Sequence, residues 1–454
     1  MLGAVLAAVA ISSQLAHTHA ALPLHACSPQ GVAAKCGTLL VPENRSVPTG
    51  GKLSLYVVVI PAITKPAAAD AFTYLAGGPG GAAATEMPSS AVSIWGSIHQ
   101  RHDIVLVDQR GTGGSNPLVC PEPTNALATG AQRRGYVRSC LAVLKSDPRL
   151  YGTRAAVDDL EAVRKALGYR SFDVYGTSYG GTVAQMYLKR FPHSVRTLTL
   201  DGATFTDIPF YSRYARNGQQ ALALLETECA AQPACAKAFP SWRNQLDSLI
   251  AKWDKTPLKL SPTSTITGIG IAGIVQGMLI TSANASKIPL LVSSAAAGDV
   301  KPLAAAVGAA NGLPRSLMYW TIMCNEPWVG IDSKGPGNTL LDGLTTFTLA
   351  QMHSVCSYIP KASEAAGAWA RVHSSVPTLV LAGQADPQDP IGNLPNLSAA
   401  LPNSRIVIAT GQGHAVGQYG CLGALVGQFV QRGSAAGLKT SCVRAIHAPA
   451  FMLS

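Results

Sequence analysis

A serine between glycines near the middle of the chain has the spacing of a catalytic nucleophile. The stretch GTSYG (176–180) fits the pattern Gly-x-Ser-x-Gly, in which the serine lies at a sharp turn between a strand and a helix. The pattern alone is weak, because a chain with 44 glycines can match it by chance. The flanks support it, since an apolar strand-like run precedes Ser178 and a helical pattern follows over 181–192. We therefore predict that Ser178 is a nucleophile.

A serine hydroxyl needs a general base, and the base needs an acid that orients it. Asp386 follows the apolar run VPTLVLAG, and His414 follows the run SRIVIATG and lies between small residues. The order Ser, Asp, His along the chain suits the Gly-x-Ser-x-Gly type of site. We predict His414 as the base and Asp386 as its acid. Asp389, three residues further on, and Asp201, after another apolar run, are the alternative acids.

The negative charge that develops on an attacked carbonyl oxygen needs hydrogen-bond donors. Tyr179 would begin the helix after Ser178, where N–H groups and the helix dipole favour an anion. The second predicted donor is the N–H of Gly78 in AGGPGG (76–81). These glycines also satisfy Gly-x-Gly-x-x-Ala, with Asp108 at the end of a later strand, which would suit a dinucleotide. We disfavour a nucleotide site, because a proline follows the first glycine and no clean helix follows the loop.

The elements that must position these residues alternate between strand-like and helical patterns. Seven runs of β-branched and aliphatic residues predict strands; they are 52–62, 71–78, 103–110, 171–178, 196–202, 376–383 and 404–411. Several of them are apolar without alternation, as expected of strands buried on both faces of a mostly parallel sheet. Between two of them, 153–168 has the apolar stripe of a helix, with Gly168 where the helix would end. We therefore predict an α/β fold with a doubly wound, mostly parallel sheet.

The alternation stops near residue 204 and resumes near 376, which predicts an insertion. Its sequence favours helices, as in 221–253. We predict a core formed by 21–204 and 371–454, and a mainly helical lid over 205–370. The lid would cover the edge at which the strands end, where α/β folds bind ligands.

The first 20 residues and the cysteines both indicate export. Residues 1–20 contain a short apolar run and then small residues suited to cleavage near Ala20, so we predict a signal peptide and a secreted or periplasmic protein. An even number of cysteines, ten, favours disulfides in such a protein. We hypothesise that neighbours pair: Cys27–Cys36, Cys120–Cys140, Cys229–Cys235, Cys324–Cys356 and Cys421–Cys442.

Charge and hydropathy exclude several classes of protein. A hydrophobic content of 47% with 13% charged residues excludes a disordered chain. The formal charge of +11 comes mostly from isolated basic residues, so we predict no nucleic-acid partner. No apolar stretch after the signal peptide is long enough to span a bilayer, so we predict no membrane association of the mature protein.

Five motifs in order resemble the α/β-hydrolases of the prolyl iminopeptidase and tripeptidyl aminopeptidase group; they are GGPGG, DIVLVDQRGTGGS, GTSYGG, GQADP and GQGH. The resemblance runs from about residue 35 to 445 and includes a cysteine-bearing C-terminal segment typical of the secreted tripeptidyl aminopeptidase-like branch. It implies the α/β-hydrolase fold and hydrolysis at the amino end of peptides, although relatives in this branch also act as esterases. It also implies that Asp108 and Arg110 form a pair that braces loops beside the site. Ala76 is a departure, since many relatives have His there.

An enzyme that recognises a peptide's amino end needs a carboxylate for the ammonium, because an unpaired buried cation is costly. The candidate is Glu326 in TIMCNEPW (321–328), where the resemblance places a similar Cys-x-Glu segment. A disulfide at Cys324 would fix its position, and Trp320 and Trp328 would wall an apolar pocket. The alternative is an exposed glutamate on a lid loop.

Together these features predict an exported serine hydrolase that cleaves short peptides from the free amino end through an acyl-enzyme. It would be prolyl- or tripeptidyl-aminopeptidase-like, and its chemistry implies no metal and no organic cofactor. The alternatives are a carboxylesterase with the same triad and a non-catalytic hydrolase fold that binds peptides.

Overall fold

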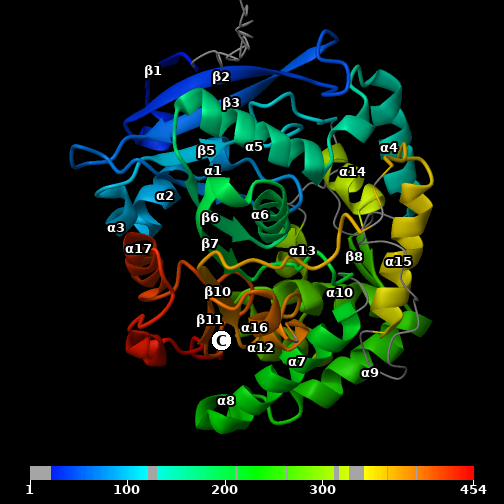
Figure 1. The fold of residues 1–454 in the computed structure, drawn as a ribbon. Coiled ribbons are helices and arrows are strands. Elements are labelled where there is room, and N and C mark those ends of the chain that lie inside the picture. The colour runs from blue at the N-terminus through cyan, green and yellow to red at the C-terminus, as the bar shows by residue number, and fades with distance from the viewer. Residues whose placement is uncertain are drawn as a thin grey trace, which may run out of the picture.

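A computed structural model of the chain describes residues 22–120, 130–209, 213–261, 264–310, 316–326, 342–363, 365, 367–394 and 396–454 (Figure 1). The predicted signal peptide, residues 1–20, and Trp328 lie outside the described residues.

A central sheet of nine strands organises the part of the chain that the structure describes. Its strands are β1 (Leu24–Cys27), β2 (Ala34–Pro42), β3 (Lys52–Ile60), β4 (Ala71–Leu75), β5 (Ile104–Val107), β6 (Phe172–Thr177), β7 (Val195–Asp201), β10 (Thr378–Gly383) and β11 (Ser404–Ala409). The order across the sheet is β1-β2-β3-β5-β4-β6-β7-β10-β11. Strands β5, β4, β6, β7, β10 and β11 run parallel, and β1, β2 and β3 extend the sheet antiparallel.

Each of the seven apolar runs coincides with one strand to within a few residues, which confirms the predicted α/β fold with a mostly parallel sheet. Strands β1 and β2 were not predicted. In β2, buried and exposed residues are mixed, and the strand lies towards the outer, antiparallel side of the sheet. It therefore lacks the continuous apolar run that marks the central strands.

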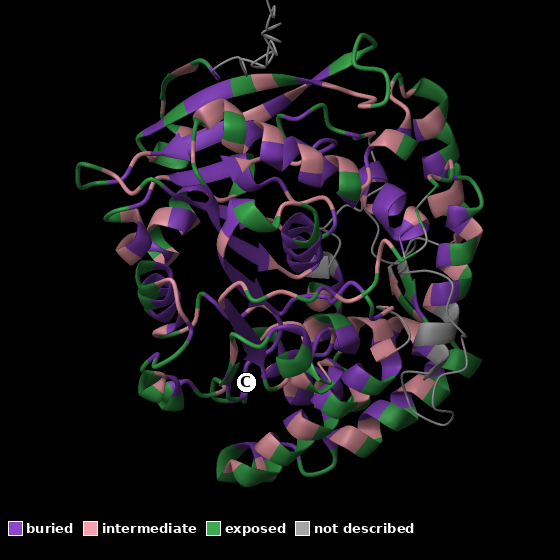
Figure 2. Cartoon of the chain, viewed as in Figure 1, coloured by how far each residue is buried: buried purple, intermediate pink, exposed green. Residues whose placement is uncertain are grey.

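Helices cover both faces of the sheet. The side chains of α4 (Gly130–Val143), α5 (Thr153–Leu167) and α6 (Tyr179–Arg190) belong to the apolar cluster on one face. The cluster on the other face includes α1 (Ala83–Glu86), α2 (Pro88–Ile94), α3 (Gly96–His99) and α17 (Leu422–Arg432). Figure 2 shows the buried strands between helices whose outer sides are exposed. As predicted, α5 ends at Gly168, which has the left-handed conformation (φ 77°) of a helix C-cap.

The stretch between β7 and β10 is mostly helical in its described residues. It contains α7 (Tyr214–Ala231), α8 (Pro233–Ala238), α9 (Trp242–Lys255), α10 (Gly268–Met278), α11 (Ser282–Ala285), α12 (Ile288–Ala296), α13 (Lys301–Ala310), α14 (Leu317–Asn325) and α15 (Asp342–Cys356). It also contains a small hairpin that was not predicted, β8 (Leu258–Ser261) and β9 (Ser264–Ile266). We call this stretch the lid; in Figure 1 most of it lies below and to the right of the sheet.

The lid has an apolar cluster of its own, to which one residue from far along the chain belongs. Helices α7, α9, α10 and α12 contribute most of the cluster, and their buried side chains include Leu222, Trp253 and Ile271. Phe451, well beyond α17, is buried in the same cluster. The N–H of Met452 donates to the carbonyl of Ser286 (3.2 Å), so this segment is held against the lid.

Five disulfides link the cysteine pairs that the sequence analysis proposed, which confirms the sequential pairing: Cys27–Cys36, Cys120–Cys140, Cys229–Cys235, Cys324–Cys356 and Cys421–Cys442. Within the described ranges, none of the helices combines the length and the apolar character that crossing a bilayer requires.

Candidate active site

The carboxyl ends of the parallel strands meet at one edge of the sheet, and the loops that leave them carry the candidate residues. The loop 76–81 follows β4, and Ser178 follows β6. Gly202 follows β7, Asp386 lies three residues after β10, and His414 lies in the loop after β11. The fold therefore gathers at one edge residues that are more than 300 positions apart in the sequence.

Ser178 lies at a strained turn. Its backbone has φ 56° and ψ −125°, a conformation that a residue with a side chain rarely adopts. A Cβ on Gly176 would lie 2.4 Å from the carbonyl oxygen of Gly180, and a Cβ on Gly180 would lie 2.0 Å from that of Leu75. Neither position can accept a side chain without moving the backbone, which is the physical reason for the Gly-x-Ser-x-Gly spacing. The Ser178 carbonyl accepts a hydrogen bond from the N–H of Thr204 (3.3 Å).

His414 and Asp386 form a buried pair. Nδ1 of His414 lies 2.8 Å from Oδ2 of Asp386, and the two residues are 9% and 1% exposed. The other oxygen, Oδ1, accepts the N–H groups of Gln388 (2.8 Å) and Asp389 (3.0 Å), so the carboxylate is fixed on both sides. A Cβ on Gly202 would lie 3.0 Å from the Nδ1 atom, so a glycine there leaves room for the imidazole.

The second ring nitrogen of His414, Nε2, is buried. Among the described residues, Nε2 has no hydrogen-bond partner, so the structure does not join it to the Ser178 hydroxyl by a hydrogen bond. Such bonds are often long in free enzymes and tighten when substrate binds. The structure thus pairs the predicted base with the predicted acid and leaves the buried Nε2 without a hydrogen-bond partner among the described residues.

Three carboxyl groups influence the charge of His414. Burial lowers the pKa of the imidazole, but Asp386, Asp389 and Asp201 outweigh that effect and raise it to about 9. Asp201 does not act as the contacting acid, because its oxygens accept the N–H groups of Val416 (2.7 Å) and Gly417 (3.0 Å). Of the three acids considered from the sequence, Asp386 is the one that contacts the ring.

The glycine loop after β4 lies against Ser178. A Cβ on Gly77 would lie 3.0 Å from Cβ of Ser178, so the chain passes the serine at close range just before Gly78. Tyr179 is the first residue of α6, where N–H groups are directed out of the helix. The lid reaches the same loop, since a Cβ on Gly80 would lie 3.1 Å from Oγ of Ser316, the N-cap of α14.

Asp108 and Arg110 brace loops, but they do not pair with each other as expected. The Asp108 carboxylate accepts the N–H groups of Ala84 (2.7 Å) and Gly114 (2.8 Å) and both donors of Thr85 (3.1 and 2.6 Å). This leaves little capacity for a nucleotide ribose. The buried Arg110 guanidinium instead binds Asp159 with two bonds of 2.6 and 2.7 Å. The sequence offered no signal for this partner on α5.

Glu326 is buried, so the alternative of an exposed lid glutamate is wrong. It is 5% exposed and follows α14 directly. Oε1 accepts the N–H of Thr153 (2.8 Å), and Oε2 accepts the hydroxyl of Thr153 (2.9 Å). That hydroxyl also lies 2.6 Å from the phenol oxygen of Tyr179, to which Gln109 donates (3.1 Å). A lid carboxylate is thereby linked to the residue that follows Ser178.

Sequence reasoning missed Thr153, which connects three elements. It begins α5, belongs to none of the sequence motifs, and lies 173 positions from Glu326 in the chain.

Trp320 is fully buried within α14. Burial raises the pKa of the Tyr179 phenol, and the Glu326 charge raises it further, which reflects how close the two side chains are.

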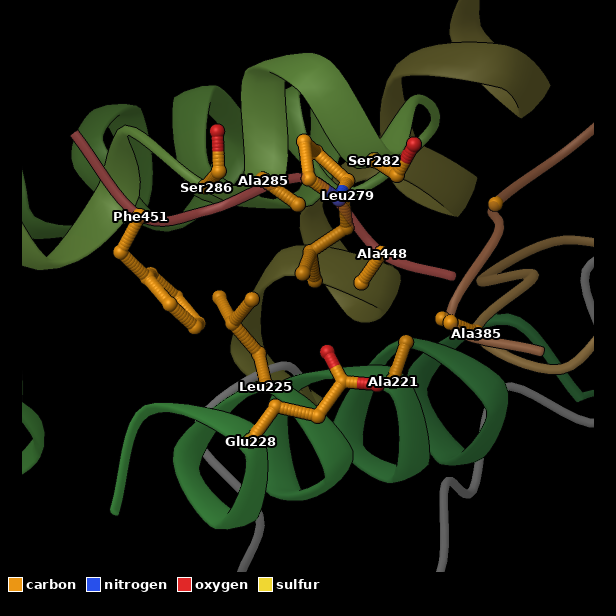
Figure 3. A pocket seen from close by; sticks show the side chains of 13 residues that line it. Ala221, Leu225, Glu228, Leu279, Ser282, Ala285, Ser286, Ala385, Ala448 and Phe451 are labelled. Carbon is orange, nitrogen blue, oxygen red and sulfur yellow. The ribbon is translucent and has the colours of Figure 1, made fainter. Parts of the chain in front are cut away.

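A small pocket lies between the lid, the segment around Phe451 and the loops that carry Asp386 and His414 (Figure 3). Ala385 and Gly413, which precede Asp386 and His414, form part of its wall. Most of the remaining wall is apolar and comes from α7, α11 and the segment around Phe451. Glu228 on α7 places a carboxyl group there, and burial raises the pKa of that group. Ser178 is not among the residues that line this pocket.

Comparison with known families matches two parts of the chain. Residues 76–256 match the α/β hydrolase fold family, and residues 345–442 match the family of TAP-like proteins.

Three curated relatives differ in their named activities. The serine protease Hip1 of Mycobacterium tuberculosis is 27% identical over 278 residues, 54% of this chain and 52% of Hip1. Tripeptidyl aminopeptidase of Streptomyces coelicolor is 29% identical over 187 residues, 37% of this chain and 34% of that protein. Carboxylesterase B of Mycobacterium tuberculosis is 29% identical over 270 residues, 54% of this chain and 51% of that protein. The chain thus spans about half, or less, of the length of the curated relatives it matches.

Among solved structures, proline iminopeptidase from Mycobacterium smegmatis superimposes with a TM-score of 0.43 and 16% identity. The superposition covers 87% of this chain and 98% of that one.

Proposed function

We propose that this chain, in which residues 76–256 match the α/β hydrolase fold family and residues 345–442 match the TAP-like proteins, is a serine hydrolase that cleaves short peptides from their free amino end. The observation that carries this proposal is the pairing of His414 with Asp386 at the strand edge that also presents the strained Ser178. The Nε2 atom of His414, which has no hydrogen-bond partner among the described residues, supports it, because a general base needs an unoccupied nitrogen to accept the proton of its nucleophile.

In the proposed reaction, His414 takes the Ser178 proton at Nε2 as Oγ attacks the substrate carbonyl carbon. Asp386 stabilises the imidazolium that forms, and the N–H groups of Tyr179 and Gly78 hold the oxyanion. The imidazolium then gives its proton to the leaving amine, which departs and leaves an acyl group on Ser178. A water molecule, activated by His414, attacks the acyl-enzyme, and the released acid restores Ser178.

Glu326 is the proposed partner of the substrate's ammonium group. The two hydrogen bonds from Thr153 hold the buried Glu326 carboxylate in place, and its negative charge is what a substrate ammonium group would need. Its link through Thr153 to Tyr179 supports a position beside the nucleophile. The named activity of the tripeptidyl aminopeptidase relative supports the same substrate class.

A carboxylesterase is the second candidate function, and a specific relative favours it. Carboxylesterase B matches a larger share of this chain than the tripeptidyl aminopeptidase does. The same triad and oxyanion donors would serve an ester, because the attack on the carbonyl carbon is identical.

We also propose that the protein is exported. The five disulfides support this, because disulfides persist in oxidising compartments and are rare in the cytosol of most organisms. The leader-like composition of residues 1–20 supports it as well.

Three substrates test the proposal with the wild type and Ser178→Ala. They are an Ala-Ala-Pro amide reporter with a free amino end, its N-acetylated twin, and a short-chain nitrophenyl ester. We expect turnover of the free-amine peptide alone, and none with Ser178→Ala. Cleavage of the ester and neither peptide would support the esterase, and no turnover at all would support a binding protein.

Glu326→Gln is the matched variant for the amino-end preference. It keeps the shape and the oxygen acceptor but removes the charge, so we expect KM for the free-amine peptide to rise about tenfold or more. Unchanged KM would remove Glu326 from the substrate site.

A further inference from the structure

We propose that Asp389 is a positioning residue of this site: a second buried carboxyl group that acts on His414 across the acid loop and sets the pH range in which the imidazole can take a proton. The inference rests on the proposed function, because it assigns to His414 the role of the base.

The backbone of Asp389 holds the acid that contacts His414. Asp389 lies three residues after Asp386 and is 7% exposed. Its N–H donates to Oδ1 of Asp386 (3.0 Å), while Oδ2 of Asp386 faces Nδ1 of His414 (2.8 Å). The main chain at Asp389 therefore fixes the orientation of the carboxylate that orients the ring.

The side chain of Asp389 points to the nucleophile side of the site. Its Oδ2 accepts the hydroxyl of Thr204 (2.9 Å), and the N–H of Thr204 donates to the carbonyl of Ser178 (3.3 Å). The Thr204 carbonyl in turn accepts bonds from Thr182 (2.9 Å) and Gln185 (3.0 Å) of α6. Asp389 thus joins the acid loop after β10 to the turn that presents Ser178.

No cation among the described residues forms an ion pair with the Asp389 carboxyl group. The basic side chains that reach the same loop are Arg213 and Arg216, and both donate to the amide oxygen of Asn393 (3.4 Å each). The charged groups that act on Asp389 are therefore His414 and Asp386. Those that act on His414 are Asp386, Asp389 and Asp201.

Burial and the neighbouring groups shift the pKa of the Asp389 carboxyl group to near neutral pH. Burial raises the pKa of Asp389; the charge of His414 opposes the rise, Asp386 adds to it, and the Thr204 hydrogen bond opposes it. The result is a pKa of about 7. An ionised Asp389 stabilises the imidazolium form of His414 and so keeps the base protonated to higher pH. Loss of the Asp389 charge must then lower the pKa of His414.

The test compares Asp389→Asn with the wild type in the pH dependence of kcat/KM. Asparagine has nearly the same shape and keeps an oxygen that can accept the Thr204 hydroxyl, so the variant removes the charge and retains the bond. We expect the acidic limb of the profile to move to lower pH by about one pH unit. The plateau should stay within about tenfold of the wild type, since Asp386 still contacts the ring.

Two further variants separate the charge of Asp389 from its effect on structure. Thr204→Val removes the bond that favours the ionised carboxylate, so we expect the limb to move in the same direction by a smaller amount. Asp247→Asn is the matched control, because it also removes one carboxylate, but from a half-exposed pair with Arg243 on the lid surface. Its profile should match that of the wild type.

Titration of His414 by NMR gives a readout that does not need turnover. In the Ser178→Ala background, we expect the His414 pKa to be lower with Asp389→Asn than without it. An unchanged His414 titration and an unchanged acidic limb would overturn the proposal. So would loss of nearly all activity in Asp389→Asn together with an active Asp386→Asn, because Asp389 would then be the acid itself. If no substrate is cleaved, the proposed function fails, and the NMR titration still decides the role of Asp389.

Discussion

At the scale of single residues, the carboxyl groups around His414 differ in what else binds them. One oxygen of the Asp386 carboxylate lies within hydrogen-bond distance of the ring, and the other accepts two backbone N–H groups. Asp201 is occupied by the backbone after His414 and by the Tyr175 hydroxyl (2.7 Å). The Asp389 carboxylate contacts neither the ring nor the backbone after His414, and its Oδ2 accepts the hydroxyl of Thr204 (2.9 Å). Three carboxyl groups thus raise the pKa of the His414 imidazole, but only Asp386 forms a hydrogen bond with it among the described residues.

The raised pKa of His414 predicts the pH dependence of activity. The imidazole must be neutral to accept the Ser178 proton, and it is protonated below its pKa of about 9. We therefore expect kcat/KM of the wild type to rise with pH, to reach half of its maximum at about pH 9 and to level off above that pH. The measurement is a pH profile of peptide turnover, with stability checked at each pH. A limb near the ordinary histidine value of about 6.5 would contradict the electrostatic picture.

At the scale of elements, helix α14 joins the lid to the core beside Ser178. Its N-cap Ser316 lies against the glycine loop, and Glu326 after its last residue binds Thr153 at the start of α5. Between the two ends of α14, the side chain of Met318 packs close to the backbone of Gly111, since a Cβ on Gly111 would lie 2.7 Å from Sδ of Met318. The helix therefore spans the loops that support the site.

Thr153→Val tests this junction. The substitution removes the hydroxyl and leaves one oxygen of Glu326 and the phenol of Tyr179 with one hydrogen bond fewer in a buried place. We expect a loss of about 1–3 kcal/mol in the free energy of unfolding, measured by chemical denaturation. Thr153→Ser, which keeps the hydroxyl, is the control. Equal stability of the two variants would show that the junction contributes nothing.

At the scale of the whole molecule, local patterns predicted what depends on neighbours in sequence. The strand runs, the helix that ends at Gly168 and the Ser178 turn each depend on a short stretch of residues. The contact of Arg110 with Asp159 and that of Glu326 with Thr153 depend on the packing of distant elements, so no local pattern indicates them. The hairpin β8–β9 was missed because its strands are only four and three residues long.

Phe451→Ala tests the attachment of the last described segment to the lid. Phe451 is buried in the lid's apolar cluster, so its removal should cost about 3–5 kcal/mol of lid stability. We expect faster cleavage of the lid in limited proteolysis. Leu453→Ala is the control, because Leu453 is 44% exposed and should change the rate little. Identical rates for both variants would mean that Phe451 does not stabilise the lid.

The position of Phe451 also bears on how the molecule is made. A ribosome synthesises the lid before it synthesises Asp386, His414 and Phe451, so the lid emerges with a gap in its apolar cluster. At that stage Ser178 lacks its proposed base, its proposed acid and a fully packed lid. The same late stretch of chain supplies all three. The proposed site and the lid's apolar cluster therefore cannot both be complete until the stretch from Asp386 to Phe451 has left the ribosome.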